Sequence, residues 1–511
     1  MTTGIHHVTA LTRDVQANVD FYAGFLGLRL VKRTAGFEDA RQLHLFYGDA
    51  AGSPGSVVTF LVWQDGAPGR VGIGQIGEIA LAVPQASIGE WLTRALSARV
   101  TVEGPSRESG ETVLRLKDPD GIIVKLVGKD IAAVAPLPDP IAPTRIHSVT
   151  LLTDKPDAAR TMLERFGYRA GPQAGAILRM LSDSDVIDLR DVAGFTPGIA
   201  GTGTFDHVAL RAADVAQVQA VAVALPDDIG DTNLHDRKYF TSLYVRDAAE
   251  ILFEFASDGP GFTVDEPVPH LGEILFTPPT STEDDTALRV VLPQFALPGA
   301  ERWPHRQLLF THRLYTPDPT DDRVLILLHG SAGDETSLLP FGHEVAPSAR
   351  LIGLRGRATD EGTLRWFRRF GFQDFDQADI VDEAAAFAAF LPDLARLYDF
   401  DLSRAVFIGH SNGANFLAAM MRHHPGLVRR AILLRAQEVL RDPPAPAGQA
   451  EGAQILMLDG KLDLFVGTAA QALAADLTAD GAQLQGVTIN ASHDLTPADR
   501  AAARDWLAAL A

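Results

Sequence analysis

The sequence predicts two folds in one chain. The first half is expected to be α+β, built from four βαβββ modules, and the second half α/β, with a doubly wound, mostly parallel sheet. The first prediction rests on a strand-then-helix pattern that recurs four times before residue 260. The second rests on continuous apolar runs that alternate with helical patterns after residue 300. A chain of 511 residues also exceeds what one core normally fills.

Composition excludes several classes of protein. The net charge is −20 and no basic run occurs, which argues against nucleic acid or an anionic membrane as a partner. No stretch approaches the ~20 apolar residues of a membrane span, and the first residues lack the features of a signal peptide. The absence of cysteine excludes disulfides, thiolate metal sites and cysteine nucleophiles. We expect a cytoplasmic protein that acts on small molecules; a homo-oligomer stays an open alternative.

The repeats of the first half align on one strand position. That position holds His7, Glu78, Ser148 and His207. Each strand runs into a helical pattern and then into short β-rich runs, so that four βαβββ units cover roughly residues 4–258. The repeated segments are "IHHVTALTRDVQANVDFYAGFLG", "GEIALAVPQASIGEWLTRALSA", "IHSVTLLTDKPDAARTMLERFG" and "DHVALRAADVAQVQAVAVAL".

A tail rich in proline and glycine follows the repeats and predicts loop and linker. We therefore expect a first domain over 1–290, a linker over 291–305 and a second domain over 306–511. In the second domain, buried parallel strands are predicted at "VLILLHG", "ARLIGLRG", "AVFIGHS", "RAILLRA", "AQILMLDG" and "GVTIN". A long helix is predicted at "QADIVDEAAAFAAFLPDLARLYD".

The last strand of each repeat offers one further aligned position. It holds Thr59, Lys125, Asp188 and Glu254. Only the fourth unit pairs a histidine of its first strand with a carboxylate here, and only the first unit supplies another such histidine, His7. Two imidazoles and one carboxylate can form a facial triad, which leaves three positions open on iron(II) for substrate and dioxygen. His6 and His7 are adjacent, and because a strand alternates its side chains, only one of them is expected to face a given site.

These stretches resemble the vicinal-oxygen-chelate (glyoxalase-like) superfamily, and more closely its hydroquinone-type ring-cleaving dioxygenases. The resemblance covers residues 1 to about 290 and includes "LHLFYGDAAGSPGSVVTF", "DRKYFTSLYVRDAAEILFEFASDGPGFTVDEP" and "HLGEILFTPP". It implies that His7, His207 and Glu254 bind Fe(II), with Mn(II) also compatible. It further implies that four residues lie near the substrate ring and its oxygens: His6, Thr9, Arg237 and Tyr244. Of these, His6 is expected to be an acid–base or orienting group, and Thr9 to contact the substrate. Asp206 departs from the family pattern, where a second histidine is common.

The stretch "GIGQIG" at 72–77 formally matches a dinucleotide-binding fingerprint. That fingerprint requires a strand before it and a helix after it, whereas here the strand comes after. We expect a linker between modules.

The second half contains a G-x-S-x-G pattern made by Gly409, Ser411 and Gly413. An apolar strand precedes it and a helix follows, which is the context of a nucleophile elbow. The chain order Ser–acid–His then predicts Ser411 as nucleophile, Asp463 as orienting carboxylate and His493 as general base. Asp463 lies in the loop after the strand, whereas Asp459, at the end of that strand, is the less favoured acid. The backbone N–H groups of Ser331 and Asn412 are expected to form the oxyanion hole.

Residues from about 306 to 511 resemble the small carboxylesterase and phospholipase-like α/β-hydrolases. The motifs are "LLHGSAGDETSLLPFG", "RWFRRF", "FIGHSNGA", "GKLDLF" and "SHDL". Two departures are mild: Ser492 replaces a common glycine, and Leu464 a common proline.

The sequence thus predicts a bifunctional enzyme. Its first half is expected to be a non-haem Fe(II), extradiol-type ring-cleaving dioxygenase of hydroquinones, and its second half a serine carboxylesterase for an ester, lactone or acyl derivative. One alternative keeps the first fold but makes it a catechol dioxygenase or a glyoxalase-like lyase or isomerase. Another makes the first half a metal–ligand binding domain, with only the hydrolase active.

Overall fold

The computed structural model describes residues 4–225, 233–279, 281, 284–304, 306–371, 373–441, 448–467 and 469–510. The chain divides into two compact units, each described by itself below. The first comprises Met1–Glu283 and Leu292–Glu301, and the second Asp284–Val291 and Arg302–Ala511. The division is therefore not a single cut, because residues 284–291 join the second unit while 292–301 return to the first. Residue 305, the last of the expected linker, lies outside the described residues.

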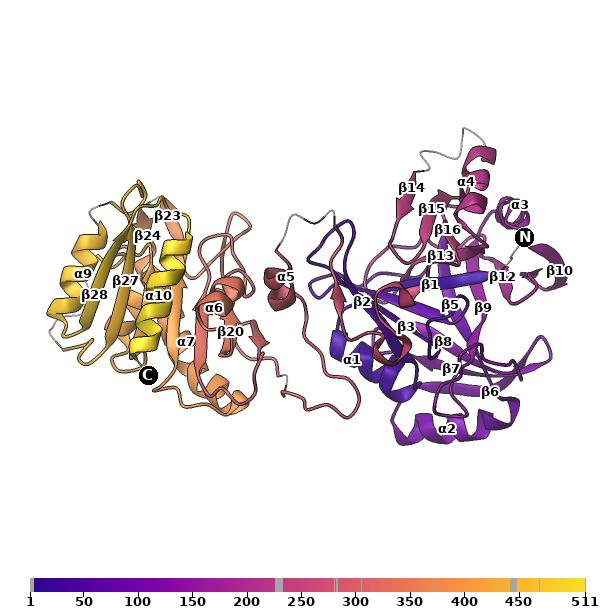
Figure 1. Cartoon of the computed structure of the whole chain (residues 1–511), viewed down its shortest axis with the longest axis horizontal. Coiled ribbons are helices and arrows are strands. Elements are labelled where there is room, and N and C mark those ends of the chain that lie inside the picture. Colours follow the sequence, from indigo (N-terminus) through magenta and orange to yellow (C-terminus); the bar gives the residue numbers. More distant parts are fainter. Residues whose placement is uncertain are drawn as a thin grey trace. The chain divides into compact units, whose positions relative to one another are not determined.

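The first unit contains the four predicted βαβββ modules (Figure 1). The first and fourth modules share one sheet. Their elements are β1 (Ile5–Thr12), α1 (Val15–Val19) with the π-helical turn η1 (Asp20–Phe25), β2 (Arg29–Ala35), β3 (Leu43–Gly48), β4 (Val57–Val62), β13 (Phe205–Ala212), α4 (Val215–Ala224), β14 (Leu234–Asp236), β15 (Thr241–Arg246) and β16 (Leu252–Ser257).

The second and third modules share the other sheet of this unit. Their elements are β5 (Gln75–Val83), the 3-10 turn η2 (Gln85–Ser87), α2 (Ile88–Ser97), β6 (Val102–Glu108), β7 (Glu111–Lys117), β8 (Ile123–Gly128), β9 (Arg145–Thr153), α3 (Pro156–Arg165), β10 (Arg169–Ala174), β11 (Ile177–Leu181) and β12 (Val186–Asp191).

Strand order places the module starts at the centre of each sheet. The first sheet runs β14-β15-β16-β13-β1-β4-β3-β2-β17 and the second β10-β11-β12-β9-β5-β8-β7-β6. In both, the two central strands pair antiparallel, β1 with β13 and β5 with β9, and each also pairs parallel with the last strand of its own module. The "GIGQIG" stretch opens no helix, as expected, but only its first three residues are linker, because Gln75 already begins β5.

The strand registers confirm the aligned positions of the repeats. Two residues beyond the first aligned position, each first strand faces the last-strand position identified from sequence. The opposed pairs are Thr9 with Thr59, Ala80 with Lys125, Thr150 with Asp188 and Ala209 with Glu254.

The tail after the fourth module, which was expected to be irregular, contains several short helices and a short strand. They are the 3-10 turns η4 (Phe262–Val264) and η5 (Val268–His270), the strand β17 (Leu275–Phe276) and the helix α5 (Asp285–Val291). β17 adds to the edge strand β2 of the first sheet. Two apolar residues of this tail, Phe262 and Leu271, are buried. They belong to the same core cluster as Val31 and Phe46.

The second unit is built on a seven-stranded sheet in the order β18-β20-β19-β25-β26-β27-β28. Only β18 pairs antiparallel, so the predicted mostly parallel sheet is confirmed. The strands are β18 (His312–Tyr315), β19 (Val324–Leu328), β20 (Arg350–Leu354), β25 (Val406–His410), β26 (Arg430–Leu434), β27 (Gln454–Gly460) and β28 (Gln483–Ile489), with two small hairpins, β21 (Ala358–Asp360)–β22 (Thr363–Arg365) and β23 (Arg369–Gly371)–β24 (Asp374–Phe375).

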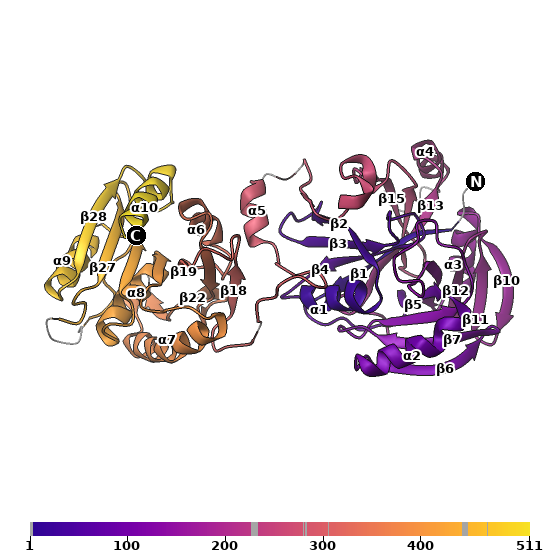
Figure 2. The ribbon, with the colours of Figure 1, turned by 60° about the horizontal axis from the view of Figure 1, so that its bottom comes forward.

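Helices cover both faces of this sheet, as a doubly wound fold requires. One face packs on α7 (Gln377–Tyr398), α8 (Asn412–His423) and α9 (Ala469–Ala479). The opposite face packs on α5, α6 (Leu339–Val345) and α10 (Pro497–Ala509). Figure 2 shows α7 and α8 on one side of β19 and β27, with α6 and α10 on the other. Among the described residues, no helix combines the length and apolar character needed to cross a bilayer.

Local sequence explains where several helices begin. Asp14 and Asp214 accept hydrogen bonds from the backbone N–H groups of Ala17 and Gln217, which caps α1 and α4. Thr496 and Asp499 form a reciprocal capping box at the start of α10. That box matters for function, because the residues just before it include His493.

Candidate active sites

A β-bulge in β1 brings His6 and His7 to the same site. The register of β1 against β13 shifts between Ile5, opposite Leu210, and His7, opposite Ala209. Nδ1 of His6 consequently lies 2.9 Å from Nδ1 of His7, and both rings are buried. The expectation that only one of these histidines could face the site is therefore wrong. A bulge interrupts the regular alternation of side chains between the two faces of a strand, and no sign of this bulge is visible in the sequence.

His7, His207 and Glu254 converge from three adjacent strands, β1, β13 and β16. Oε2 of Glu254 lies 2.8 Å from Nε2 of His207 and 3.2 Å from Nε2 of His7, and the two Nε2 atoms are 3.4 Å apart. All three side chains are buried. Among the described residues, they form the only cluster of three such groups whose donor atoms lie close enough to share a metal ion.

The second ring nitrogen of each histidine is engaged elsewhere. Asp206 Oδ2 lies 2.7 Å from Nδ1 of His207, and Nδ1 of His7 faces His6. Each Nε2 is thus the nitrogen directed at the shared point, the arrangement in which a metal-binding histidine is usually held. Asp206, a departure from the family pattern, takes the orienting role for His207.

The charges at this point suit a cation. Burial opposes ionisation of Glu254, but His7 and His207 lower the pKa of its carboxyl well below the usual range. Burial also opposes a charge on His207, yet the nearby carboxylates of Asp206 and Glu254 raise its pKa to about 9. Oε2 of Glu254 has no well-aligned hydrogen bond to any described residue. A divalent cation held by the two Nε2 atoms and Oε2 would satisfy that buried oxygen, so the residues fit a metal.

Beneath the triad lies a chain of hydrogen-bonding side chains. Oγ1 of Thr9 is 2.9 Å from Nε2 of His207, the Thr59 hydroxyl donates to Thr9 at 2.9 Å, and Nε2 of His44 is 2.8 Å from Thr59. The hydroxyl of Ser242 donates to Oε1 of Glu254. Burial, followed by the charges of His7 and His207, lowers the pKa of His44 to about 3. The sequence analysis did not identify His44. The available signal was its position two residues before Phe46 on β3, which places both side chains on the same face of the sheet.

Aromatic rings and one guanidinium border the triad. Tyr244 lies directly opposite Glu254 across β15 and β16, and its ring meets His207 edge-on at 5.6 Å between centroids. Arg237 lies over the Tyr244 ring at 5.4 Å. Phe240 contacts the rings of His6 and His7. Burial, then the charge of Glu254, raises the pKa of the Tyr244 hydroxyl, which therefore stays protonated. The structure thus gathers His6, Thr9, Arg237 and Tyr244 around the triad.

The other sheet of this unit carries ion pairs at the corresponding positions. Lys125 Nζ lies 2.7 Å from Glu78 Oε1, and Arg179 Nε lies 2.9 Å from Asp188 Oδ1. Thr150 also donates to Glu78. Among the described residues of that sheet, no group of three histidine or carboxylate side chains could share a metal ion.

In the second unit, Ser411 occupies a sharp turn between β25 and α8. Its φ and ψ are 51° and −115°, a strained conformation typical of a nucleophile elbow. A Cβ on Gly409 would lie 2.7 Å from the backbone nitrogen of Ala414, and one on Gly413 would lie 2.3 Å from the carbonyl oxygen of Leu328. Glycine is therefore required on both sides of the serine.

The three predicted catalytic residues of this unit are hydrogen-bonded in series. Nε2 of His493 lies 2.9 Å from Oγ of Ser411, and Nδ1 lies 2.8 Å from Oδ2 of Asp463. The other oxygen of Asp463 accepts from the backbone N–H of Phe465. Asp459 is not the partner: its Oδ1 has no hydrogen bond to a described residue, and burial raises its pKa to about 6. The arrangement is that of a nucleophile, a general base and an orienting carboxylate.

Arg435 holds the loop that carries His493. Its guanidinium donates to the carbonyl oxygens of Ser492 and Asp494, on either side of the histidine, at 2.9 and 3.0 Å. It also donates to Leu458 at the end of β27 and to both oxygens of Asp499. The Arg435 and Asp499 side chains are fully buried. All five guanidinium N–H groups are thereby used, and the sequence analysis did not identify this residue.

The residues Arg365 and Trp366 tie together the two loops expected to form the oxyanion hole. The backbone N–H of Trp366 donates to Oδ1 of Asn412 at 2.7 Å, and its indole N–H donates to the carbonyl of His329. Arg365 Nη1 donates to Oγ of Ser331 at 2.6 Å. A Cβ on Gly330 would lie 3.6 Å from that of Ser411, so the 330–331 backbone passes beside the nucleophile. These contacts fix both loops around Ser411.

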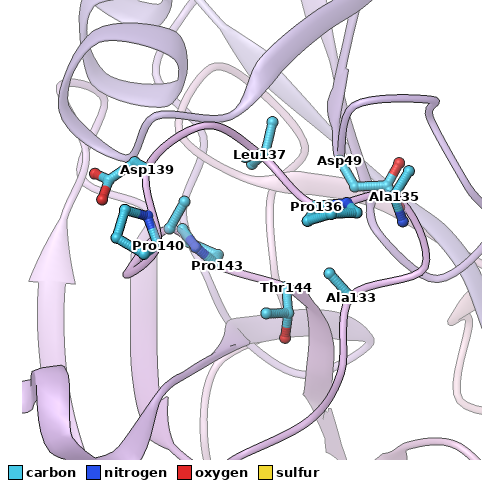
Figure 3. Close-up of a pocket in the computed structure, with 10 residues that line it drawn as sticks. Asp49, Ala133, Ala135, Pro136, Leu137, Asp139, Pro140, Pro143 and Thr144 are labelled. Carbon is cyan, nitrogen blue, oxygen red and sulfur yellow. The ribbon is translucent and has the colours of Figure 1, made fainter.

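A separate cavity of about 70 Å3 lies in the first unit between Asp49 and the proline-rich segment 133–144 (Figure 3). Asp49 is its one buried charged group, and its carboxylate accepts backbone N–H groups of Ala51, Ser53 and Ala135. None of the lining residues belongs to either triad.

Comparison with known proteins finds relatives of both units. Residues 4–126 match the Glyoxalase/Bleomycin resistance protein/Dioxygenase superfamily. The chain is 35% identical over 288 residues to the "Putative ring-cleaving dioxygenase MhqO" of Bacillus subtilis, covering 54% of this chain and 91% of that protein. It is 31% identical over 309 residues to the chlorohydroquinone/hydroquinone 1,2-dioxygenase of Sphingobium indicum, covering 56% of this chain and 95% of that protein.

Two further similarities extend this result. The crystal structure of a "putative dioxygenase" from Bacillus subtilis aligns with a TM-score of 0.54 at 33% identity, over 58% of this chain and 98% of that one. The "Putative hydrolase MhqD" of the same organism is 31% identical over 188 residues, covering 37% of this chain and 93% of that protein.

Fold and relatives therefore define a two-part enzyme, a β-sheet unit with a candidate metal centre joined to an α/β-hydrolase unit. The chain belongs to the ring-cleaving dioxygenases of the glyoxalase superfamily and carries a fused α/β-hydrolase unit.

Proposed function

We propose that the first unit is a non-haem Fe(II), extradiol-type dioxygenase that opens the ring of hydroquinones, and that the second is a serine carboxylesterase. The observation that carries the first assignment is the convergence of His7, His207 and Glu254 on one point. For the functional domains we keep the limits 1–290 and 306–511.

Two imidazole nitrogens and one carboxylate oxygen suit Fe(II), and Mn(II) would accept the same ligands. Iron(II) bound there would supply neighbouring open positions for the ring oxygen and dioxygen, and electron transfer between them. The name of the Sphingobium relative, a hydroquinone dioxygenase, supports a para-diol as substrate.

The protein's own residues position the reactants. His6 orients His7 through the contact of their Nδ1 atoms, and Asp206 does the same for His207. Tyr244 and Phe240 offer flat apolar surfaces to an aromatic ring, and Tyr244 keeps a proton to donate to a ring oxygen. The guanidinium of Arg237, over Tyr244, favours negative charge on that oxygen. Thr9, buried beside His207, contacts the substrate bound next to this ligand.

In the second unit, His493 takes the proton of Ser411 as Oγ attacks an ester carbonyl, while Asp463 keeps the imidazole oriented. The backbone N–H groups of Ser331 and Asn412 stabilise the developing oxyanion. His493 then protonates the departing alcohol and later activates the water that releases the acid. The substrate is an ester, lactone or acyl derivative.

Oxygen uptake tests the first assignment. Protein loaded anaerobically with Fe(II) should consume oxygen with methylhydroquinone and much less with catechol. Uptake with catechol alone would indicate a catechol dioxygenase. No uptake with either would leave a lyase, isomerase or binding role for the first unit.

Two variants separate the activities. Glu254→Gln should abolish oxygen uptake and leave the hydrolysis of 4-nitrophenyl acetate unchanged, whereas Ser411→Ala should do the reverse. If Glu254→Gln spared oxygen uptake, the dioxygenase assignment would fail. Sequential action of the units is supported only by their fusion. It would be refuted if Ser411→Ala left every product of ring opening unchanged.

A further inference from the structure

Arg365 is a buried arginine whose hydrogen bonding is incomplete. It ends β22 and is 7% exposed. Its Nη1 donates to the Ser331 hydroxyl, but Nε has no hydrogen-bond partner among the described residues. The nearest carboxylate, that of Asp360, lies 3.7 Å from Nε, which is beyond hydrogen-bond distance.

Three other buried or half-buried arginines of this unit are paired with carboxylates, whereas Arg350, which also lacks a carboxylate partner among the described residues, donates to the carbonyl of Tyr398 and lies over the ring of Trp303. Arg435 donates to both oxygens of Asp499, and Arg355 to both oxygens of Glu335. Arg422 reaches the carboxylates of Asp480 and Glu438. Leaving a buried guanidinium without such a partner is costly, because desolvation of the charge is not compensated. A ligand that brings its own carboxylate would complete the hydrogen bonding of Arg365.

The position of Arg365 directs such a ligand to the nucleophile. Its guanidinium contacts Ser331, whose backbone N–H is an expected oxyanion donor, and the next residue, Trp366, holds Asn412. The preceding residue of the loop, Gly330, adjoins Ser411. A carboxylate bound by Arg365 would therefore lie close to an ester carbonyl attacked by Ser411, with only the Ser331 side chain between Arg365 and the oxyanion loop.

We propose that Arg365 binds a carboxylate on the acyl part of the substrate, so that the second unit prefers half-esters of short dicarboxylic acids. The proposal rests on the esterase function proposed above. In the hydrolysis of monomethyl succinate, water cleaves the acyl C–O bond and releases methanol and succinate, with no other reactant. Oxidative ring opening also leaves acidic groups on its product, so derivatives of such acids belong to this substrate class.

The test compares two methyl esters of similar length in the full-length protein. Monomethyl succinate carries the carboxylate and methyl pentanoate does not, and acid release from both is followed by pH-stat titration at pH 7.5. We expect kcat/KM to be at least about 10-fold higher for the half-ester. Arg365→Gln should lower kcat/KM for the half-ester by roughly 10- to 100-fold, the size of a hydrogen bond to a charged group. Both esters should lose the part of the rate that depends on the contact of Arg365 with the Ser331 loop. The loss for methyl pentanoate should nevertheless be at least about 10-fold smaller than for the half-ester, and the additional loss for the half-ester should appear mainly in KM.

Arg369→Gln is the matched control. Arg369 also faces Asp360, at 3.8 Å, but has no contact with Ser331, so its loss should leave the ratio between the two esters unchanged. Arg365→Lys should restore part of the preference, because an ammonium retains the charge but lacks the fork of the guanidinium.

Equal losses for both esters in Arg365→Gln would overturn the proposal and leave Arg365 as a positioning residue for the Ser331 loop. A wild-type preference for methyl pentanoate would overturn it even if the variant failed to fold. Ser411→Ala distinguishes failure of this proposal from failure of the esterase function on which it rests. If that variant still hydrolysed both esters, the esterase assignment itself would be wrong.

Discussion

Nε2 of His7 and Nε2 of His207 lie 3.4 Å apart although 200 residues separate them in the chain. They meet because β1 and β13, from the first and fourth modules, pair antiparallel at the centre of one sheet, with Thr9 opposite His207. β16 then pairs parallel with β13 and brings in Glu254. The site therefore depends on which modules share a sheet.

Glu254→Gln should weaken binding of Fe(II) by more than the roughly 10- to 100-fold lost when an outer partner of a ligand is changed. The amide keeps the size of the side chain but removes the negative charge at Oε2. Isothermal titration with Fe(II), or with Mn(II) under air, measures the change without relying on activity.

Asp188→Asn is the control for that substitution. It makes the same chemical change at the corresponding position of the other sheet, where Asp188 pairs with Arg179. Metal affinity should stay at the wild-type value. Equal weakening in both variants would mean that the metal does not bind at the triad.

Arg435→Lys should lower kcat for ester hydrolysis by about 100-fold, because a 1 Å displacement of a catalytic group can cost that much. Lysine cannot hold the carbonyls of Ser492 and Asp494 and the carboxylate of Asp499 together. The free energy of unfolding should also fall, by about 3 kcal/mol, as for other disrupted buried ion pairs.

Arg422→Lys separates the two effects of that change. Arg422 is also buried and paired with two carboxylates, but it lies at the end of α8, away from the His493 loop. Urea denaturation should show a similar loss of stability, while kcat stays within a few-fold of wild type. A matching fall of kcat would assign the effect of Arg435 to stability alone.

Asp459→Asn should raise the free energy of unfolding at pH 8. The pKa of Asp459 is raised from 3.8 to about 6, mainly by burial. The folded protein therefore binds this proton more tightly than the unfolded chain, and the penalty of the charged carboxylate is fully present above pH 6. The gain on substitution should be about 1–2 kcal/mol after discounting for partial exposure, and it should vanish below about pH 4. Urea denaturation across pH 4–8 measures it.

The same pair of aspartates discriminates between the two candidate acids. Asp463→Asn should reduce kcat by about four orders of magnitude, as for a triad whose histidine loses its orienting carboxylate. Asp459→Asn should leave kcat within a few-fold. The reverse result would make Asp459 the triad acid.

A fragment that starts at residue 284 should be more stable than one that starts at 306. Val290 of α5 is buried in the core that α6 and α10 form with the sheet, and Arg313 donates to the carbonyl of Val291. Burying one valine contributes about 1.5–3 kcal/mol. Thermal unfolding of the two fragments measures the difference; equal melting temperatures would show that α5 adds nothing to this core.

Local patterns determined much of this protein. Alternation and apolar runs located the four modules and the parallel strands, because side-chain periodicity follows backbone geometry within one element. Ser411, Asp463 and His493 could be named because the nucleophile elbow requires glycines at fixed spacing, and the structure hydrogen-bonds these three residues. His7, His207 and Glu254 followed from aligning the repeats.

Only the tertiary structure decided the rest. The bulge that turns His6 toward His7, the fourth histidine His44 near the site, and the five bonds of Arg435 all depend on contacts between distant segments. The pairing of the first module with the fourth, and of the second with the third, is likewise a choice among equivalent strands. A repeat specifies each unit by its own pattern, but which units join depends on the complementarity of their surfaces, which no single segment contains.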